Sequence, residues 1–172
     1  PVVAYYDRGK TGGVPNNDLR LVHCTVNACS TKNDNAVETT NDVGQYNSMQ
    51  LDSSGFPVIS YYDLTNSDLR VAVCVDVNCS GAATITNVDS ANAVGQYTSL
   101  VLDQASSTCT SGTKNCPVVA YLDSTLSYVK LARCTTNTCT GANLNTVGTS
   151  GSGIGSGGYN SMKLDGSGYP VI

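Results

Sequence analysis

Residues 46–74 read YNSMQLDSSGFPVISYYDLTNSDLRVAVC and contain three strand-like segments joined by two short connections. The segments 46–52, 57–63 and 68–74 are rich in Val, Ile, Leu and Tyr, the residue types that strands prefer. Ser, Asn, Asp and Gly fill the connections, as tight turns require. The stretch predicts consecutive antiparallel strands. Because side chains alternate along a strand, one face of 57–63 would carry Val58, Ser60 and Tyr62, and the other Ile59, Tyr61 and Asp63.

The same phrase recurs along the chain. Pro1, Pro57, Pro117 and Pro170 each begin the phrase of 57–63, at spacings of 56, 60 and 53 residues. Further strands are accordingly expected at the matching segments 1–7, 18–24, 97–103, 117–123, 128–134 and 159–165. We therefore divide the chain into repeat units at 1–56 (which begins partway through a unit), 57–116, 117–169 and 170–172. Both ends of the sequence fall inside the phrase, so we expect a processed chain or a segment of a longer one.

A fourth, weaker strand is expected in each unit, at 36–40, 84–88 and 143–147. No convincing amphipathic helix is found. Four antiparallel strands in a unit of this length match one blade of a β-propeller. We predict an all-β protein of β-propeller-type repeats, with about three four-stranded blades in an incomplete ring or an open stack. The innermost strand of a blade would be 46–52, and the runs 43–46, 94–97 and 157–159 would lead the chain back to it.

The eight cysteines fall into four close pairs. Three pairs share the spacing C-x4-C at equivalent places in the units, and the fourth brackets a longer insertion. We predict four local disulfides at hairpin tips: Cys24–Cys29, Cys74–Cys79, Cys109–Cys116 and Cys134–Cys139. A zinc site is disfavoured because C-x2-C is absent and His23 is the only histidine. Disulfides persist in oxidising compartments, so an exported, extracellular or cell-surface protein is expected.

Composition narrows the classes of partner. Charged residues make up 13% of the chain and the net charge is −4, which argues against nucleic acid as a partner. No segment approaches the ~20 apolar residues of a membrane-spanning helix. We expect no membrane span, no bound metal and no cofactor.

The pattern S-x-x-L-D-x-x-G-x-P-V-I-S-Y-Y-D, followed by D-L-R-V-A, resembles tandem repeats of secreted and surface proteins of bacteria with β-propeller-like blades. It is also distantly similar to the Asp-box of sialidases. The resemblance covers nearly the whole chain. It implies a propeller-like architecture and says little about activity.

A sialidase-like hydrolase resembling that family would need three clustered arginines, a nucleophilic Tyr beside a Glu, and an acidic Asp. Glu38 is the sole glutamate. Arg20 and Arg70 occupy one repeat position, with Lys130 in the third unit, which indicates a structural contact, with Asp7 and Asp63 as partners. His23 has Val73 and Arg133 as equivalents and is interpreted as a surface histidine. We predict no catalytic residues and a non-enzymatic protein.

Tyrosines are better candidates for a functional role than the charged residues, since the chain contains ten Tyr and only one Phe. Two interpretations are open. The rings pack between blades with their hydroxyls on polar neighbours, or they stack on sugars in the grooves between blades. Together with Arg20 and Arg70, the candidates for ligand or inter-blade contacts are Tyr6, Tyr62, Tyr46, Tyr97 and Tyr159.

Two further features have mainly structural interpretations. Asp7, Asp63 and Asp123 each end the second strand of a unit, where a side-chain-capped turn is favoured over a calcium site. The Gly/Ser run 148–158 is interpreted as a loop.

Three functions are compatible with these observations. The first is a non-enzymatic extracellular structural repeat protein, a building block of a surface layer, adhesin or filament. Its partners would be copies of itself or further repeats of the same chain. The second is a carbohydrate-binding propeller lectin with glycans as ligands, and the third is a sialidase-like glycoside hydrolase fragment.

Overall fold

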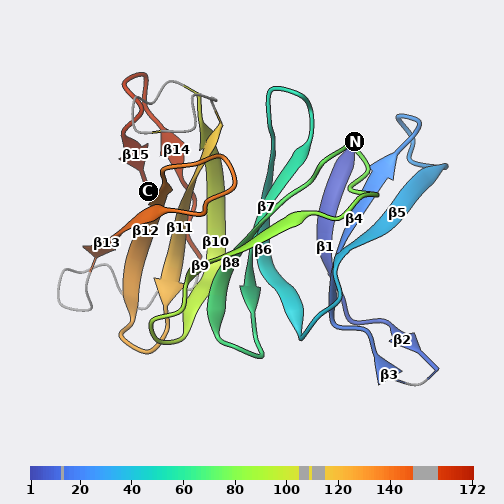
Figure 1. Cartoon of the computed structure of the whole chain (residues 1–172), viewed down its shortest axis with the longest axis horizontal. Coiled ribbons are helices and arrows are strands. Elements are labelled where there is room, and N and C mark those ends of the chain that lie inside the picture. Colours follow the sequence, from blue (N-terminus) through green and yellow to red (C-terminus); the bar gives the residue numbers. More distant parts are fainter. Residues whose placement is uncertain (13, 105–108, 110–114, 149–158) are drawn as a thin grey trace.

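The computed structural model describes residues 1–12, 14–104, 109, 115–148 and 159–172. Within these ranges the secondary structure consists of strands and turns, with no helix, which confirms the all-β class. Figure 1 shows three sheets side by side, following one another in chain order from right to left. No helix of the described part is long and apolar enough to cross a membrane.

Every sheet is antiparallel and connects its strands in sequence order. The first sheet contains β1 (Val2–Asp7), β4 (Asp18–Cys24) and β5 (Lys32–Glu38). The second contains β6 (Val43–Leu51), β7 (Pro57–Asp63), β8 (Asp68–Val73) and β9 (Thr84–Asp89). The third contains β10 (Val94–Asp103), β11 (Cys116–Asp123), β12 (Tyr128–Cys134) and β13 (Ala142–Gly148). Two short pairs complete the fold: β2 (Lys10–Thr11) with β3 (Val14–Pro15), and β14 (Lys163–Leu164) with β15 (Pro170–Val171).

Several predicted boundaries were wrong. The fourth strand of the first unit is Lys32–Glu38 and not 36–40, because its pairing with β4 starts at the disulfide end, where Lys32 lies opposite Cys24. The runs 43–46 and 94–97 belong to β6 and β10 and are not connections. Of the segment 159–165, only Lys163–Leu164 forms a strand. The β2–β3 hairpin, which projects at the lower right of Figure 1, was not predicted. Residues 149–158 of the Gly/Ser run lie outside the described residues.

The apolar core lies between successive sheets. β7 and β11 are buried along their whole length, because their alternating side chains serve two interfaces. Ile59 and Tyr61 pack against the first sheet, whereas Val58 packs against the third, which confirms the predicted division of faces. Two clusters hold most of the buried apolar side chains. One joins the first and second sheets (Leu19, Leu21, Val43, Ile59, Tyr61, Ala72), and the other joins the second and third (Val58, Leu69, Val71, Leu100, Val119, Tyr121).

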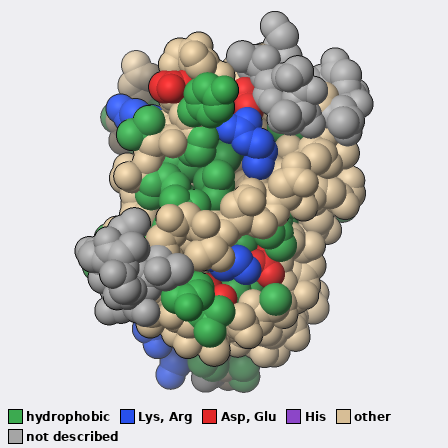
Figure 2. Space-filling model, turned by 90° about the vertical axis from the view of Figure 1, so that its left-hand side faces the viewer, with side chains coloured by type: hydrophobic (Ala, Val, Ile, Leu, Met, Phe, Trp, Pro, Cys, Tyr) green, Lys and Arg blue, Asp and Glu red, His purple; other side chains and the backbone are tan. Residues whose placement is uncertain are grey.

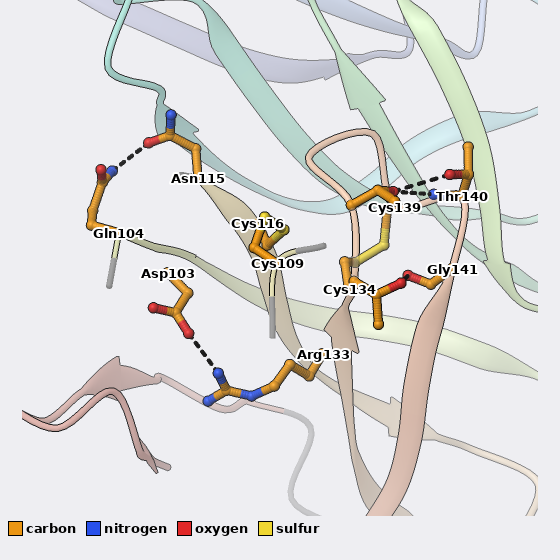
Figure 3. Close-up of a disulfide and its surroundings, with 12 residues drawn as sticks. Asp103, Gln104, Cys109, Asn115, Cys116, Arg133, Cys134, Cys139, Thr140 and Gly141 are labelled. Carbon is orange, nitrogen blue, oxygen red and sulfur yellow. Dashed lines mark hydrogen bonds and ion pairs between the residues drawn. A yellow bond between two sulfur atoms is a disulfide. The ribbon is translucent and has the colours of Figure 1, made fainter. Parts of the chain in front are cut away.

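All four predicted disulfides are present: Cys24–Cys29, Cys74–Cys79, Cys109–Cys116 and Cys134–Cys139. Figure 3 shows two of them in the third sheet, where the Cys134–Cys139 bridge closes the tip between β12 and β13. Three of the bridges close tips of this kind. Cys109–Cys116 instead precedes β11, between the first two strands of its sheet. Four disulfides indicate that the chain folds in an oxidising environment.

The aspartates at the ends of the second strands cap turns, as predicted. Asp63 accepts a hydrogen bond from the Asn66 amide at 3.1 Å, and Asp123 accepts one from the Leu126 amide at 3.0 Å. Asp7 accepts one from the Gly9 amide at 2.7 Å. Each carboxylate therefore satisfies backbone donors that a tight turn leaves without a strand partner.

Candidate functional site: a row of tyrosines on the inner strands

The candidate site begins with an irregularity shared by β6 and β10. In β6, two residues, Tyr46 and Asn47, lie opposite the single residue Tyr61, between the pairs Gln45–Tyr62 and Ser48–Ser60. β10 has the same irregularity at Tyr97 and Thr98. Such β-bulges bend a strand and redirect a side chain.

Tyr46 and Tyr97 both adopt a left-handed backbone conformation, with φ of 52°. A bulky residue rarely occupies this region, which costs about 1–3 kcal/mol. The surrounding contacts therefore hold both residues in it, and the same conformation recurs at equivalent positions of two sheets.

A glycine makes the close approach of each bulge possible. A Cβ on Gly44 would lie 2.9 Å from the Leu19 Cα, and one on Gly95 would lie 2.7 Å from the Leu69 Cα. Both glycines also have a φ of 103°, which residues with a Cβ rarely adopt. The glycine of the Val-Gly-Gln-Tyr motif is thus required where an inner strand passes β4 or β8 of the preceding sheet.

The bulges align tyrosines from three successive units in a row. The ring centroids of Tyr46 and Tyr97 are 4.3 Å apart, and those of Tyr97 and Tyr159 are 4.9 Å apart. Tyr62 continues the row on the other side, 6.1 Å from Tyr46. The rings are tilted by 47–58°, an arrangement in which aromatic pairs attract each other. We call Tyr46, Tyr97 and Tyr159 the tyrosine row.

A shallow pocket of about 190 Å³ follows this row. It is lined by Tyr46, Asn47, Tyr97, Thr98, Tyr159 and Asn160. Tyr46 is 38% exposed and Tyr159 is 91% exposed, so ring surface remains accessible to a ligand. Burial, together with the neighbouring Tyr97 hydroxyl, raises the pKa of Tyr46. The Tyr46 hydroxyl therefore stays protonated at neutral pH.

Hydrogen bonds tie the row to consecutive inner strands. Thr98 Oγ1 donates to the Tyr46 carbonyl at 2.7 Å. Asn160 Nδ2 donates to the Tyr97 carbonyl, also at 2.7 Å. The Ser48 hydroxyl accepts a hydrogen bond from the Leu100 amide at 3.0 Å, and the Ser99 hydroxyl accepts one from the Met162 amide at 2.9 Å. Each inner strand is thus bonded to the next in the same way.

The other two candidate tyrosines lie apart from the pocket. Tyr62 is buried. Tyr6 is half-buried, and its hydroxyl donates to Asp42 at 2.7 Å and to Asn17 at 3.2 Å. These contacts match the packing interpretation for these two residues.

The predicted arginine contacts with aspartate are present. Arg70 lies 3.0 Å from Asp63, and Arg20 lies 3.8 Å from Asp7. Arg70 also pairs with Glu38 of the first sheet at 2.5 Å, and the Tyr61 hydroxyl donates to the same carboxylate. Burial raises the pKa of Glu38, and burial beside this carboxylate raises the pKa of Tyr61.

The same three-residue contact joins the second and third sheets. Lys130 donates to Asp89 at 2.5 Å, and the Tyr121 hydroxyl donates to it at 2.7 Å. Burial works to raise the pKa of Asp89, but the hydrogen bonds from Lys130, Tyr121 and the Ala91 amide outweigh it and hold that pKa below its usual range. Glu38 and Asp89 are therefore acids that link one sheet to the next.

This linking role of Glu38 and Asp89 was not predicted from the sequence. The sequence does contain a signal that could have identified these two acids. Glu38 lies five positions before Val43, and Asp89 lies five positions before Val94, where each valine begins a Val-Gly-Gln-Tyr motif. Their lateral partners come from the next unit, so the role becomes clear only when the sheets are placed side by side.

The arginines do not gather at one point. Arg20 pairs with Asp34 at 3.0 Å, Arg70 with Glu38, and Arg133 with Asp103 at 2.5 Å (Figure 3). Each pair belongs to a different sheet or interface. Within the described residues, moreover, no three His, Cys, Asp or Glu side chains come together in a way that could hold a metal ion.

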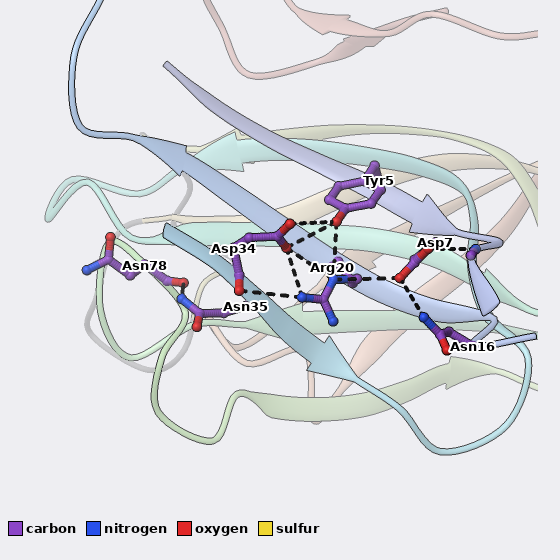
Figure 4. Close-up of polar contacts among 8 residues, drawn as sticks. Tyr5, Asp7, Asn16, Arg20, Asp34, Asn35 and Asn78 are labelled. Atoms are coloured by element: carbon purple, nitrogen blue, oxygen red, sulfur yellow. Dashed lines mark hydrogen bonds and ion pairs between the residues drawn. The ribbon is translucent and has the colours of Figure 1, made fainter. Parts of the chain in front are cut away.

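The disulfide tips also connect successive sheets. Asn78, directly before Cys79, lies against the first sheet, where Asn35 Nδ2 donates to its carbonyl at 2.9 Å (Figure 4). His23 Nδ1 lies 2.7 Å from Asn78 Oδ1. Thr138, directly before Cys139, accepts a hydrogen bond at its carbonyl from Thr86 at 2.7 Å. The half-buried His23 is therefore part of a contact between sheets.

No protein-family model matches this chain. No curated protein and no solved structure is significantly similar to it either.

Proposed function

We propose that the chain is a non-enzymatic extracellular structural protein of β-propeller-type units, a building block of a surface layer, adhesin or filament. The observation that carries this proposal is the position of the core. Two clusters lie between successive sheets, so each sheet is buried by its neighbours. Such units stack into arrays whose stability comes largely from nearest-neighbour contacts.

Two further observations support a structural role. The recurring charged residues are engaged between sheets, as in Arg70 with Glu38 and Lys130 with Asp89. Disulfides close three equivalent tips. Two of these tips, at Asn78 and Thr138, accept a hydrogen bond from the preceding sheet. A short disulfide loop of this kind contributes about 2 kcal/mol and holds an exposed tip in place.

Immunogold labelling of cells that produce the chain tests this function. We expect label on the outer surface, in a regular layer or along filaments, and native protein without reactive thiols. Label confined to the cell interior, or free thiols in the native protein, would contradict the proposal.

Carbohydrate binding is the second candidate, and the tyrosine row favours it. Two of its rings are exposed and lie beside the amide side chains of Asn47 and Asn160. Sugars bind to sites of this composition because an aromatic ring covers the apolar face of the pyranose while amides bond its hydroxyls.

A glycan array followed by titration of the best ligand tests this candidate. Tyr159→Ala should weaken binding about tenfold, since one aromatic contact contributes up to ~1.5 kcal/mol. The matched control is Tyr169→Ala, which removes a ring that is also exposed but lies outside the row. Equal affinities of the two variants, or an array without binding, would remove carbohydrate binding from consideration.

A further inference from the structure

A second pocket, of about 320 Å³, lies where the second and third sheets meet. This volume falls within the range of about 300–1,000 Å³ that is typical of small-molecule sites. The pocket shares no described residue with the pocket of the tyrosine row. Its lining includes two valines of the second sheet and polar residues of the connections around them, namely Asp52, Ser53, Ser54, Val58, Val73 and Asn115.

Two positions of this lining have equivalents in the third sheet. Val73 lies opposite Val58 in β7, and Arg133 occupies the same register position between β12 and β11. Asp52 is the equivalent of Asp103, because each directly follows the residue of an inner strand that pairs with the proline of the repeated phrase. The third sheet therefore has an arginine where the second has Val73, and both sheets have the aspartate.

The connection that comes from the following strands is equivalent as well. Asn115 and Gly168 each lie two residues before a proline of the repeated phrase, and both have a φ of 83°. Their amides make the same hydrogen bond, at 3.0 Å, to the carbonyls of Asp103 and Asp165. Asn115 also lies against the β6–β7 turn, where its side-chain amide donates to Ser53 Oγ at 3.0 Å.

In the third sheet an arginine side chain occupies this place. Arg133 Nη1 donates to Asp103 Oδ2 at 2.5 Å (Figure 3), and Nη2 donates to the Gly168 carbonyl at 2.7 Å. One planar guanidinium thus bonds to two acceptors at once. Figure 2 shows the face at this end of the molecule, where basic side chains lie beside acidic ones among hydrophobic side chains.

The second sheet has the carboxylate but a valine in place of the arginine. Asp52 is half-buried, and its Oδ1 accepts hydrogen bonds from the Ser54 and Phe56 amides, both at 2.8 Å. Within the described ranges of the chain, Asp52 Oδ2 has no hydrogen bond and no ion pair. A carboxylate oxygen in this position is available for a charge-assisted hydrogen bond from a cation.

We propose that this pocket binds the guanidinium group of an arginine side chain that belongs to a partner polypeptide. One guanidinium nitrogen donates to Asp52 Oδ2 and another to the Asn115 carbonyl, as Arg133 donates to its two acceptors in the third sheet. The methylene groups of the bound side chain lie on Val58 and Val73, because long basic side chains bury their stems on apolar surface. This site goes beyond the proposed structural role and does not depend on it.

The lining also indicates how the arginine is presented. Among the described residues that line the pocket, Asp52 is the single charged one. The α-carboxylate of a free arginine would therefore find no basic partner there, whereas an arginine within a peptide has no such group. An arginine of a polypeptide is favoured over the free amino acid for this reason.

Titration of the full ¹⁵N-labelled chain with N-acetyl-arginine amide, followed by two-dimensional NMR, tests the site. We expect shifts of the Ser53, Ser54 and Asn115 amides and a Kd of about 1 mM, a weak affinity that suits a single side chain. N-acetyl-citrulline amide has nearly the same shape without the charge and should bind at least tenfold more weakly. Equal binding of the two compounds, or no shift at these amides, would overturn the proposal. Tighter binding of free arginine would overturn the assignment to a polypeptide.

Substitution of the carboxylate gives a matched pair of variants. Asp52→Asn keeps an oxygen that can cap the turn but removes the charge, so it should weaken binding at least tenfold. The control is Asp165→Asn, since Asp165 accepts the same two turn hydrogen bonds, from the Ser167 and Tyr169 amides, and lies outside the pocket. This control should bind like the wild type, and equal affinities of the two variants would contradict the site.

A third variant supplies the arginine from within the chain. Val73→Arg should abolish binding of N-acetyl-arginine amide, because its own guanidinium reaches Asp52 as Arg133 reaches Asp103. Unchanged circular dichroism would show that this variant is folded, and undiminished binding by the folded variant would overturn the proposal. Should Val73→Arg not fold, the comparison of Asp52→Asn with Asp165→Asn decides.

Discussion

Replacing Asp89 by alanine should lower the free energy of unfolding by about 3–5 kcal/mol, the effect of removing one partner of a buried ion pair. The Asp89 carboxylate is buried at the interface of the second and third sheets, where Lys130 and Tyr121 both donate to it. Without it, the Lys130 ammonium is left in a site with little access to water. Urea unfolding followed by circular dichroism measures the change.

The matched control is Asp34→Ala, because Asp34 makes the same contacts with Tyr5 and Arg20 on an exposed face. Exposed ion pairs contribute about 0–1 kcal/mol, so this variant should remain close to the wild type. Equal losses for the two variants would show that burial between sheets does not determine the strength of the contact.

The effect of Asp89→Ala should also depend on pH in one direction. The pKa of Asp89 in the folded protein lies below its usual range, so the carboxylate form is the one that stabilises the fold. Its contribution is fully present above the pKa of an unfolded Asp, about 3.9. The difference between wild type and variant should therefore shrink as the pH falls below about 4, through the pKa of the folded state.

Gly95→Ala should destabilise the protein by about 2–6 kcal/mol, the sum of two costs. The added Cβ would lie 2.7 Å from the Leu69 Cα, and relieving an overlap with backbone costs about 1–3 kcal/mol. The φ of 103° adds a conformational cost of about 1–3 kcal/mol for a residue with a side chain. Because β10 would move away from β8, the tyrosine row should separate as well. Denaturant unfolding and the near-ultraviolet circular dichroism of the tyrosines measure the two effects.

Gly55→Ala separates the two costs. Gly55 also has a positive φ, of 79°, but a Cβ there would meet no atom within 4 Å. Only the conformational cost remains, so the loss should be about 1–3 kcal/mol. A Gly95→Ala variant no less stable than Gly55→Ala would mean that the inner strand does not pass the preceding sheet as closely as the structure shows.

Local chemistry explains why much of the fold could be predicted. Strand composition placed β7, β8, β11 and β12 within a residue or two of their observed bounds. Turn chemistry identified the caps at Asp63 and Asp123. The spacing C-x4-C identified three of the disulfides, since cysteines at that separation across a hairpin tip lie close enough to bond. These features depend on residues that are near one another in the chain.

One error occurred where a strand depends on a neighbouring sheet. Val43–Tyr46 has the composition of a connection, yet it forms the bulged start of β6 because the Val43 amide bonds to the Asn17 carbonyl at 3.0 Å. Strand propensity cannot indicate such a contact, since it comes from the preceding sheet.

The amino-acid sequence alone determined the strand order within a sheet, the cysteine pairs and the alternation of faces along β7, because these follow from side-chain periodicity and short-range closure. Only the tertiary structure decided which acid meets which base between sheets and which tyrosines share a pocket. Glu38 reaches Arg70, and Tyr46 reaches Tyr97, across an interface between sheets. Such contacts form only when one sheet is laid against the next, and the burial that makes them strong arises at the same moment.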